Sequence, residues 1–325
     1  MSFTNNSRQS RQKKHSLCLA VSACLVGQKV RYDGDHKQHA FVSDLAQKGI
    51  ELRPICPEVE IGLGVPRPTI HIVEQDGGLR AVGVDGSALD VTQKLNRFGS
   101  MTAQQLGDVD GYIFKARSPS CGVSSTPHSM VDGRTQKGPG LFAAQIMQQL
   151  PLMPVIEETS LESLVQQVNY LQRVEAYRRW REFIAQSKGQ MSLHEFHQQN
   201  RLSLMAHGRE GLNQIECRLE VLPQSDRFTQ NQLQEYGSQF MRQCRHKATH
   251  RRHVIVLRHL RSQLHKQLDK VQQQNLVRLV DAYAEGQMGL AQVITELRLI
   301  SQQASIECLG QQSYLQSTFS LNMEK

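Results

Sequence analysis

The chain has 325 residues, of which 39% are apolar and 21% are charged, and its formal net charge is +8. This length predicts two domains, and the apolar share excludes a largely disordered chain. No apolar run reaches the ~18 residues that a membrane-spanning helix needs. The positive charge favours an anionic partner, and nucleic acid is the most common one for a basic protein.

The first fifteen residues are polar and basic, and they include Arg8, Arg11, Lys13 and Lys14. Because they lack the apolar core of a signal peptide, we expect residues 1–15 to form a disordered tail and the protein to be cytoplasmic. The chain has seven cysteines, an odd number, and cytoplasmic thiols stay reduced. We therefore expect metal binding or burial for the cysteines, not a disulfide framework.

Residues 16–158 alternate short β-branched runs with helical patterns. Strands are expected over 16–25, 50–59, 70–75, 79–84, 109–117 and 151–158, and helices over 90–106 and 138–150. Strands that alternate with helices predict an α/β domain with an open, mostly parallel, Rossmann-like sheet. In such sheets, ligands bind beyond the carboxyl ends of the strands, where the strand order reverses.

The second half of the chain has helical periodicity. Apolar residues recur at three- and four-residue steps at Leu161, Leu164, Val168, Leu171 and Val174, and again at Leu257, Leu260, Leu264, Leu268 and Val271. The first stripe predicts a helix over 160–184, with Ser160 and Glu162 at its start. We expect an all-α domain over 159–325 that packs closely on the α/β domain over 16–158, because no long linker separates them.

Three cysteines lie at or after the ends of predicted strands, in segments with serine, proline or glycine: Cys24 and Cys56 close their strands, and Cys121 lies in the loop after 109–117. Residues of these types make exposed turns, so we expect the three thiols to meet at one edge of the sheet. The other four cysteines lack such surroundings. Cys18, Cys217, Cys244 and Cys308 are expected to be small buried residues in a strand or in helices.

Three thiols are compatible with three kinds of site. A structural zinc ion usually has four protein ligands, and a nucleophilic cysteine needs only one thiol and a base. An iron–sulfur cluster usually has four cysteine ligands, so a cluster with three leaves one iron open as a Lewis acid. The gaps of 32 and 65 residues between the cysteines do not decide among these chemistries.

The stretches CLVGQKVRYDG, CPEVEIGLGVPR and KARSPSCG, followed by GPGLFAAQIMQQLPLMPVIEE, resemble the thiouracil desulfidase family from about residue 17 to 158. The resemblance implies a [4Fe-4S] cluster held by Cys24, Cys56 and Cys121, with the fourth iron free to take the sulfur of a substrate.

The second half resembles an all-α domain of formerly unknown function that is often fused behind the desulfidase domain. The resemblance rests on FHQQNRLSLMAHGREGLNQIECRL and on residues 249–298. The fusion resembles the tRNA 4-thiouridine desulfidases, which implies conversion of 4-thiouridine in tRNA to uridine with release of sulfide. Desulfidation of free thiouracil or thiouridine, and a non-catalytic module that binds a cluster or RNA, are the alternatives.

The loops around the cysteines also carry polar side chains suited to this reaction. Water attack on the pyrimidine C4 needs a base, and departure of the sulfur needs an acid. We expect Glu58 to serve as this catalytic group, Lys115 to hold an anionic intermediate and Ser118 to donate a hydrogen bond. The expected substrate-binding residues are Arg31, Asp33, Ser120 and Arg67. For the two arginines, a salt bridge within the loops is the alternative role.

Between Arg242 and Lys266 there are eight lysines or arginines and no acidic residue. The residues expected on a solvated, RNA-binding face are Arg251, Arg252, Arg258, Arg261 and Lys266. The nearby histidines, His246, His250 and His253, are expected at the surface, and not in a metal site. The alternative is that the charge only keeps the domain soluble.

Overall fold

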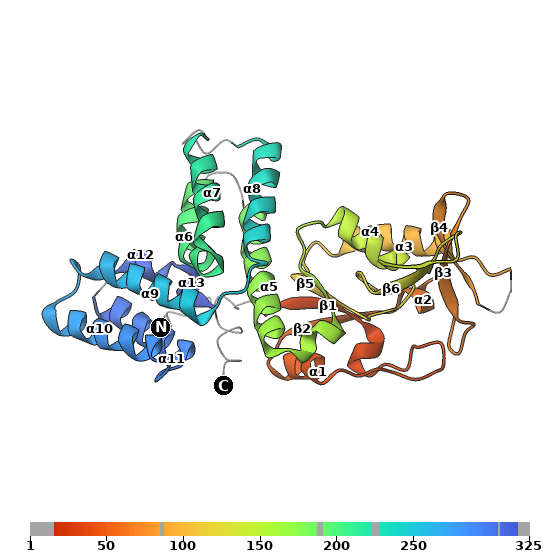
Figure 1. Cartoon of the computed structure of the whole chain (residues 1–325), viewed down its shortest axis with the longest axis horizontal. Helices are drawn as coiled ribbons and strands as arrows, with labels where there is room; N and C mark the ends of the chain where they lie inside the picture. Colours follow the sequence, from red (N-terminus) through yellow and green to blue (C-terminus); the bar gives the residue numbers. More distant parts are fainter. Residues whose placement is uncertain (1–15, 85–87, 187–190, 223–227, 305, 318–325) are drawn as a thin grey trace, which may run out of the picture.

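The computed structural model describes residues 16–84, 88–186, 191–222, 228–304 and 306–317. The predicted basic tail with Arg8, Arg11, Lys13 and Lys14 lies outside the described residues. An α/β half and a helical half lie side by side, and the long helix α5 (Leu164–Ala185) runs between them (Figure 1).

The first half contains a parallel sheet that confirms the predicted fold class. Its strands are β1 (Cys18–Ser22), β2 (Glu51–Ile55), β5 (Gly111–Phe114) and β8 (Val155–Glu157), in the order β2-β1-β5-β8. Each of the four falls within a predicted strand. Since β2 lies on one side of β1 and β5 on the other, the strand order reverses at β1. A ligand site is therefore expected beyond the carboxyl ends of these central strands.

A second, mixed sheet follows the order β4-β3-β6-β7. The strands predicted over 70–75 and 79–84 are present as the antiparallel pair β3 (Ile70–Gln75) and β4 (Gly78–Gly83). The pair β6 (Thr126–Ser129) and β7 (Thr135–Gly138) was not predicted, since TPHS and TQKG lack the apolar alternation of a half-buried strand.

Short helices cover the sheets. They are α1 (Ala40–Gln47), α2 (Pro57–Glu60), α3 (Thr92–Gln105) and α4 (Leu141–Gln149), with a 3₁₀ turn, η1 (Ala23–Val26), after β1. The predicted helices over 90–106 and 138–150 are confirmed as α3 and α4. These two helices pack together, with the rings of Phe98 and Phe142 stacked at 5.5 Å.

The second half is helical, as predicted. After the 3₁₀ turn η2 (Glu158–Glu162) and α5 come α6 (Leu193–His207), α7 (Arg209–Glu220), α8 (Gln230–Gln243), α9 (His250–Leu264), α10 (Lys270–Ala284), α11 (Leu290–Gln303), α12 (Glu307–Gly310) and α13 (Ser313–Gln316). In the described part of the chain, no helix is both long and apolar enough to cross a bilayer.

Several local predictions for this half were wrong. Ser160 and Glu162 lie in η2, and Ser163 is the residue that precedes α5. Val271 is 66% exposed because α9 ends at Leu264 and α10 starts a new helix with its own buried face. Cys217 is exposed on α7, whereas Cys18 and Cys244 are buried as expected. The Cys308 side chain lies outside the described part.

The two halves pack together through α5. Arg181 Nη2 donates to Asp110 Oδ1 at 2.6 Å, and the backbone N–H of Cys18 donates to Asp110 Oδ2 at 2.9 Å. A Cβ on Gly111 would lie 2.9 Å from Val174 Cγ2, so this glycine lets α5 approach β5 closely. The close packing expected from the short connection is therefore present, while the division into two domains at 16–158 and 159–325 stays a prediction.

Candidate functional site

A pocket of about 350 Å³ opens at the carboxyl ends of β1, β2 and β5, and Cys24, Cys56 and Cys121 all line it. Cys24 lies in η1 directly after β1, and Cys56 follows β2 and precedes α2. Cys121 lies in the loop after β5. The three thiols therefore meet at the edge of the sheet where the strand order reverses, as the sequence predicts.

The three thiols are largely withdrawn from solvent. Burial raises the pKa of Cys24 to about 11, against the opposing effect of Lys115, and burial also raises the pKa of Cys56. Burial raises the pKa of Cys121 well above its ordinary value, against a hydrogen bond from Ser22 that lowers it. Because a metal binds the thiolate form, metal binding at this pocket would release these protons.

The backbone around Cys121 is fixed by local contacts. Ser118 Oγ accepts hydrogen bonds from the N–H groups of Ser120 at 3.3 Å and of Cys121 at 3.1 Å. A Cβ on Gly140 would come within 2.5 Å of the Ser120 carbonyl carbon, so only glycine allows α4 to begin against this loop. The loop therefore presents its thiol from a defined position.

A buried carboxylate organises the residues that follow Cys121. Glu157 Oε1 accepts hydrogen bonds from the N–H groups of Val123, Ser124 and Ser125 at 2.7, 3.1 and 3.2 Å, and from the Ser125 hydroxyl at 2.8 Å. Burial raises the pKa of Glu157, but these hydrogen bonds outweigh it, so the net pKa is lowered. Sequence reasoning missed this residue because its partners lie more than thirty positions away.

Glu58, Arg67 and Ser120 form one hydrogen-bonded group. Arg67 Nε donates to Glu58 Oε2 at 2.7 Å, and Ser120 Oγ donates to Glu58 Oε1 at 2.9 Å. Arg67 Nη1 also donates to the carbonyls of Val30 at 2.9 Å and Gly64 at 3.0 Å. Arg67 therefore makes the salt bridge that was its alternative role. Ser120 is fully buried and is not among the residues that line the pocket, so it supports Glu58 from behind the wall, and its contact with substrate stays a prediction.

Of the two predicted substrate-binding residues Arg31 and Asp33, only Arg31 lines the pocket, while Asp33 lies in the adjoining loop. Arg31 lines the pocket and pairs with Asp33 at 3.3 Å. Asp33 does not line the pocket, and its Oδ1 accepts a hydrogen bond from the N–H of Asp35 at 3.2 Å. Asp33 therefore braces the loop that follows Cys24, and its contact with substrate stays a prediction.

Lys115 lines the pocket and already has a counter-charge. Its Nζ forms an ion pair with Glu158 and donates to the carbonyl of Ala116 at 3.2 Å. Glu158 also accepts a hydrogen bond from the N–H of Ala116 at 2.5 Å. The ion pair places the Lys115 ammonium at a defined point of the pocket wall.

Lys37, a basic residue of the loop after Cys24, also lines the pocket, and so do Thr69 and Arg117, which sequence reasoning did not single out. Arg117 has a positive φ of 60°, which is rare for a residue with a side chain and often marks a functional site. In the sequence, Arg117 could have been recognised as a site residue because it lies between Lys115 and the SPSCG segment that contains Cys121. The basic residues Lys37 and Arg117, together with Arg31, Arg67 and Lys115, give the pocket a lining that favours anions.

The donor set is compatible with an iron–sulfur cluster. Cys24, Cys56 and Cys121 line one pocket, and cysteine thiolates are the usual ligands of such clusters. Within the described ranges, no three His, Cys, Asp or Glu side chains already form a group that could hold a metal ion.

Part of the predicted RNA-binding face is confirmed as a solvated surface. Arg258, Arg261 and Lys266 line an open hollow of about 630 Å³ between α9 and α10, and Arg261 lies 3.8 Å from Asp281. Arg251 is also exposed on α9. RNA binding by these residues stays a prediction.

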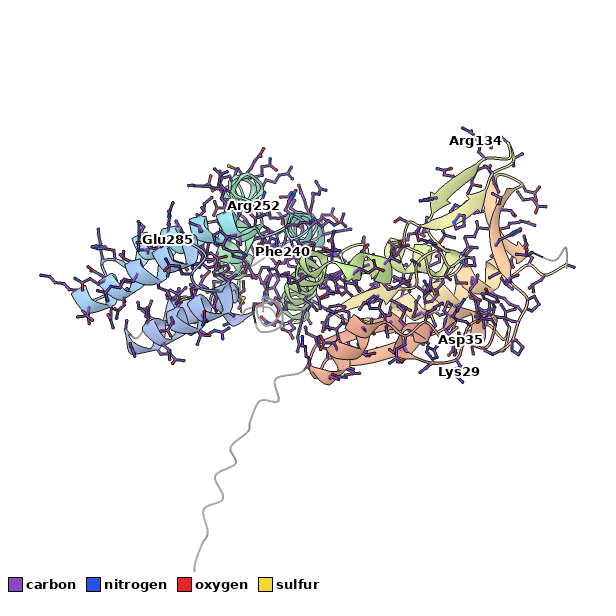
Figure 2. All side chains as sticks on the ribbon, turned by 60° about the horizontal axis from the view of Figure 1, so that its bottom comes forward. Lys29, Asp35, Arg134, Phe240, Arg252 and Glu285 are labelled. Carbon is purple, nitrogen blue, oxygen red and sulfur yellow. The ribbon has the colours of Figure 1, made fainter. Side chains whose placement is uncertain are left out.

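Arg252 does not belong to this face, contrary to expectation. Its Nη1 donates to the carbonyl of His207 at 2.9 Å and to the carbonyl of Lys247 at 2.7 Å. The guanidinium thus satisfies carbonyls at the ends of neighbouring elements. Figure 2 shows Arg252 in the helical half, away from Asp35 in the α/β half.

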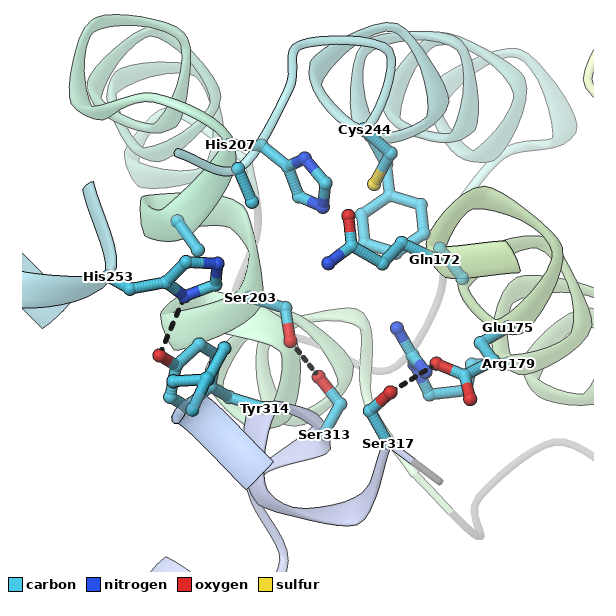
Figure 3. A pocket seen from close by; sticks show the side chains of 15 residues that line it. Gln172, Glu175, Arg179, Ser203, His207, Cys244, His253, Ser313, Tyr314 and Ser317 are labelled. Carbon is cyan, nitrogen blue, oxygen red and sulfur yellow. Dashed lines mark hydrogen bonds between the residues drawn. The ribbon is translucent and has the colours of Figure 1, made fainter. Parts of the chain in front are cut away.

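His253 was expected at the surface, but it is buried. Its Nδ1 forms a hydrogen bond with the hydroxyl of Tyr314 at 2.8 Å, beside a small cavity of about 40 Å³ in the helical half (Figure 3). Burial lowers the pKa of His253 to about 3 and that of His207, on the same cavity, to about 4. His250 is exposed and contacts the carbonyl of Tyr283 at 2.9 Å.

Comparisons with known proteins match the two halves separately. Residues 19–158 match the family model described as 2-thiouracil desulfurase, and residues 201–318 match a protein family of unknown function, DUF1722. Among solved structures, the "[4Fe-4S]-dependent thiouracil desulfidase TudS" is 29% identical, with a TM-score of 0.36, over 45% of this chain and 94% of that chain. Curated proteins give no match. The family models confirm the resemblance of each half: residues 19–158 are similar to 2-thiouracil desulfurases, and residues 201–318 are similar to the DUF1722 family.

Proposed function

We propose that this chain removes sulfur, as sulfide, from a thiolated pyrimidine, with a [4Fe-4S] cluster held by Cys24, Cys56 and Cys121. One observation carries the proposal: the three thiols line a single pocket, and they do so within the region that matches the desulfurase model. The similar solved protein is itself named as a [4Fe-4S]-dependent thiouracil desulfidase.

The reaction exchanges a thiocarbonyl for a carbonyl. Water supplies the oxygen, the sulfur leaves as hydrogen sulfide, and no electrons are gained or lost. A cluster with three thiolate ligands supplies an open iron, a Lewis acid that accepts soft sulfur. The protein must then take a proton from the attacking water and return one to the products.

Glu58 is the group best placed to move these protons. It lines the pocket two residues after Cys56, and its two oxygens are held by Ser120 and Arg67. A carboxylate has about four acceptor positions, so these two hydrogen bonds leave others for a water molecule. The held carboxylate therefore receives the proton of the attacking water without first changing its rotamer.

Ser118 and Lys115 complete the polar groups of the mechanism. Ser118 Oγ accepts two backbone hydrogen bonds, which leaves its own proton to donate toward a pyrimidine oxygen or nitrogen in the pocket. The Lys115 ammonium, held by Glu158, stabilises negative charge that develops on the ring after water attacks.

Anaerobic purification with iron and acid-labile sulfide analysis tests the cluster. We expect about four irons per chain, lost in Cys24→Ala, Cys56→Ala and Cys121→Ala. The control Cys217→Ala removes an exposed thiol outside the pocket and keeps the iron. A colourless zinc protein, or three alanine variants that all keep their iron, would contradict the proposal.

Thiouracil turnover by the iron-loaded protein tests the role of Glu58. Glu58→Gln keeps the size of the side chain and one acceptor oxygen, so the iron content stays that of the wild type. We expect kcat to fall by about 10²- to 10⁴-fold, the usual contribution of a general base. An unchanged kcat would remove Glu58 from the mechanism.

For the substrate, we propose 4-thiouridine within tRNA. The basic hollow formed by Arg258, Arg261 and Lys266 supports this choice, because a free base offers no phosphates for such a surface to bind. A base inside folded RNA must leave its stack to enter the pocket, and backbone contacts help to offset that cost.

Rates on thiolated tRNA and on free 2-thiouracil, measured at several salt concentrations, test the substrate. The double variant Arg258→Gln/Lys266→Gln should weaken tRNA binding. The slope of the logarithm of the binding constant against the logarithm of the salt concentration should become less steep by about 1 for each phosphate that the variant no longer binds. Lys94→Gln, which removes an exposed lysine on α3, is the control. Activity confined to the free base would refute the tRNA substrate and leave the desulfidation intact.

A further inference from the structure

Tyr32 brings an aromatic ring to the pocket, and the proposed mechanism does not use it. Among the described residues that line the pocket, Tyr32 is the one with an aromatic side chain. It is 44% exposed, although an aromatic ring contributes most to stability or binding when it is covered. An exposed ring at the wall of a pocket is therefore available to cover a ligand.

The backbone of Tyr32 is tied to the side of the pocket that carries the proposed base. Its carbonyl accepts a hydrogen bond from the N–H of Arg67 at 3.0 Å, and Arg67 Nε donates to Glu58 at 2.7 Å. Tyr32 also lies within a turn, because the N–H of Gly34 donates to the carbonyl of Arg31 at 3.0 Å. The position of Tyr32 is therefore fixed relative to the carboxylate that takes the proton of the attacking water.

The ring of Tyr32 is held by Arg31. The guanidinium carbon of Arg31 lies 5.3 Å from the centroid of the ring, and Arg31 itself pairs with Asp33 at 3.3 Å. A cation over an aromatic ring is attracted by the electrons of its face, so this contact restricts the ring. Since both Tyr32 and Arg31 line the pocket, the ring is held beside the space that the substrate would fill.

The proposed substrate is a flat ring that needs a defined orientation. Water attacks the thiocarbonyl carbon from one face of the pyrimidine, so the plane of the base must keep a fixed angle to Glu58. The apolar side chains of Val30, Ile55 and Ile70 also line the pocket and suit the faces of a base. A base that has left its stack in RNA is commonly held by stacking on an aromatic side chain.

We propose that Tyr32 is the stacking platform for the thiolated pyrimidine, with the base lying flat against its ring. The inference rests on the proposed function, because it names the contact that orients the substrate of that reaction. A stack is present both in the bound substrate and in the transition state, so it strengthens binding without changing the chemical step. Tyr32 thereby replaces part of the stacking that a base loses when it leaves folded RNA.

The test compares Tyr32→Leu, which removes the ring, and Tyr32→Phe, which keeps it, with the wild type, each loaded anaerobically. The matched control is Val65→Ala. Val65 is 41% exposed and lies near the same turn, with its Cγ1 3.9 Å from the place of a Cβ on Gly34, but it does not line the pocket.

The readouts are iron content, kcat and KM on 2-thiouracil, and the dissociation constants of uridine and dihydrouridine by calorimetry. Dihydrouridine keeps the hydrogen-bonding edge of uridine, but its ring has lost one double bond and is no longer flat, so it stacks poorly. The ratio of the two dissociation constants therefore reports stacking, and it needs no turnover.

We expect wild-type iron content in all three variants. In Tyr32→Leu, KM should rise by about 5- to 150-fold, the range for the loss of one stack between a base and an aromatic ring, while kcat stays unchanged. The wild type, Tyr32→Phe and Val65→Ala should bind uridine more tightly than dihydrouridine, and this preference should disappear in Tyr32→Leu.

An unchanged KM in Tyr32→Leu, or a preference for uridine that persists in this variant, would overturn the inference and leave the proposed function standing. Should Tyr32→Leu fail to load, equal affinities of the wild type for uridine and dihydrouridine would still overturn it. A wild-type protein without a cluster would overturn both the inference and the proposed function.

Discussion

The ion pair of Arg67 and Glu58 allows a quantitative test of how the pocket loops are held. Arg67 is 4% exposed and Glu58 is 13% exposed, and their contact is 2.7 Å long. Arg67 also binds the carbonyls of Val30 and Gly64, so one side chain ties the loop after Cys24 to the loop after Cys56. Arg67→Met removes all three interactions and keeps most of the apolar volume.

The expected loss of stability follows from burial. Breaking a buried pair leaves an uncompensated charge and costs about 3–5 kcal/mol. Glu58 keeps its hydrogen bond from Ser120 and some contact with solvent, so we expect about 3 kcal/mol for Arg67→Met. The matched control is Arg31→Met, whose pair with Asp33 is longer, at 3.3 Å, and has side chains 21% and 38% exposed. Its loss of stability should stay below about 1 kcal/mol.

Native-state hydrogen exchange followed by mass spectrometry measures both losses in the metal-free protein, peptide by peptide across the α/β half. We expect Arg67→Met to speed exchange in the peptides that contain Val30 and Gly64. The double variant Glu58→Gln/Arg67→Met should lose less stability than the sum of its single variants, since the two residues interact. A loss below about 1 kcal/mol for Arg67→Met, or strict additivity, would refute the view that this pair holds the loops.

Three further perturbations test the rest of the fold. Burial lowers the pKa of His207 from 6.5 to about 4 and that of His253 from 6.5 to about 3. Below about pH 6.5, these two histidines therefore bind protons in the unfolded chain but not in the folded chain. The helical half should therefore lose about 1.4 kcal/mol per pH unit for each histidine down to about pH 4, measured as urea midpoints, and a flat profile would contradict this. Glu157→Gln weakens a carboxylate that accepts from three N–H groups and a hydroxyl, so it should cost about 1–3 kcal/mol and speed exchange in the loop after Cys121; unchanged exchange would count against this role. Arg181→Met leaves Asp110 buried without its cation, so the free energy of unfolding should fall by about 3 kcal/mol and the melting temperature should drop. An unchanged melting temperature would show that apolar packing alone holds α5 against the sheet.

Local pattern was sufficient to predict the strands β1 to β5 and β8, the two long helices of the α/β half and the meeting of Cys24, Cys56 and Cys121. Each cysteine stands just after a β-branched run or in the loop that follows one, and the carboxyl ends of parallel strands meet at one edge. The resemblance to the desulfidase family also rested on contiguous residues, and the family model matches the same stretch. These features depend on neighbours in sequence, which is why the sequence alone determined them.

Only the tertiary structure decided which polar side chains face the pocket and which support it. Ser120 reaches Glu58 from a loop 62 residues away, and the network leaves Ser120 behind the pocket wall. His253 is buried and Cys217 exposed, because the face of a helix that becomes core depends on the helices packed against it. A residue's type and spacing set its chemistry and its strand or helix, but contacts between distant segments set its burial and its hydrogen-bond partners.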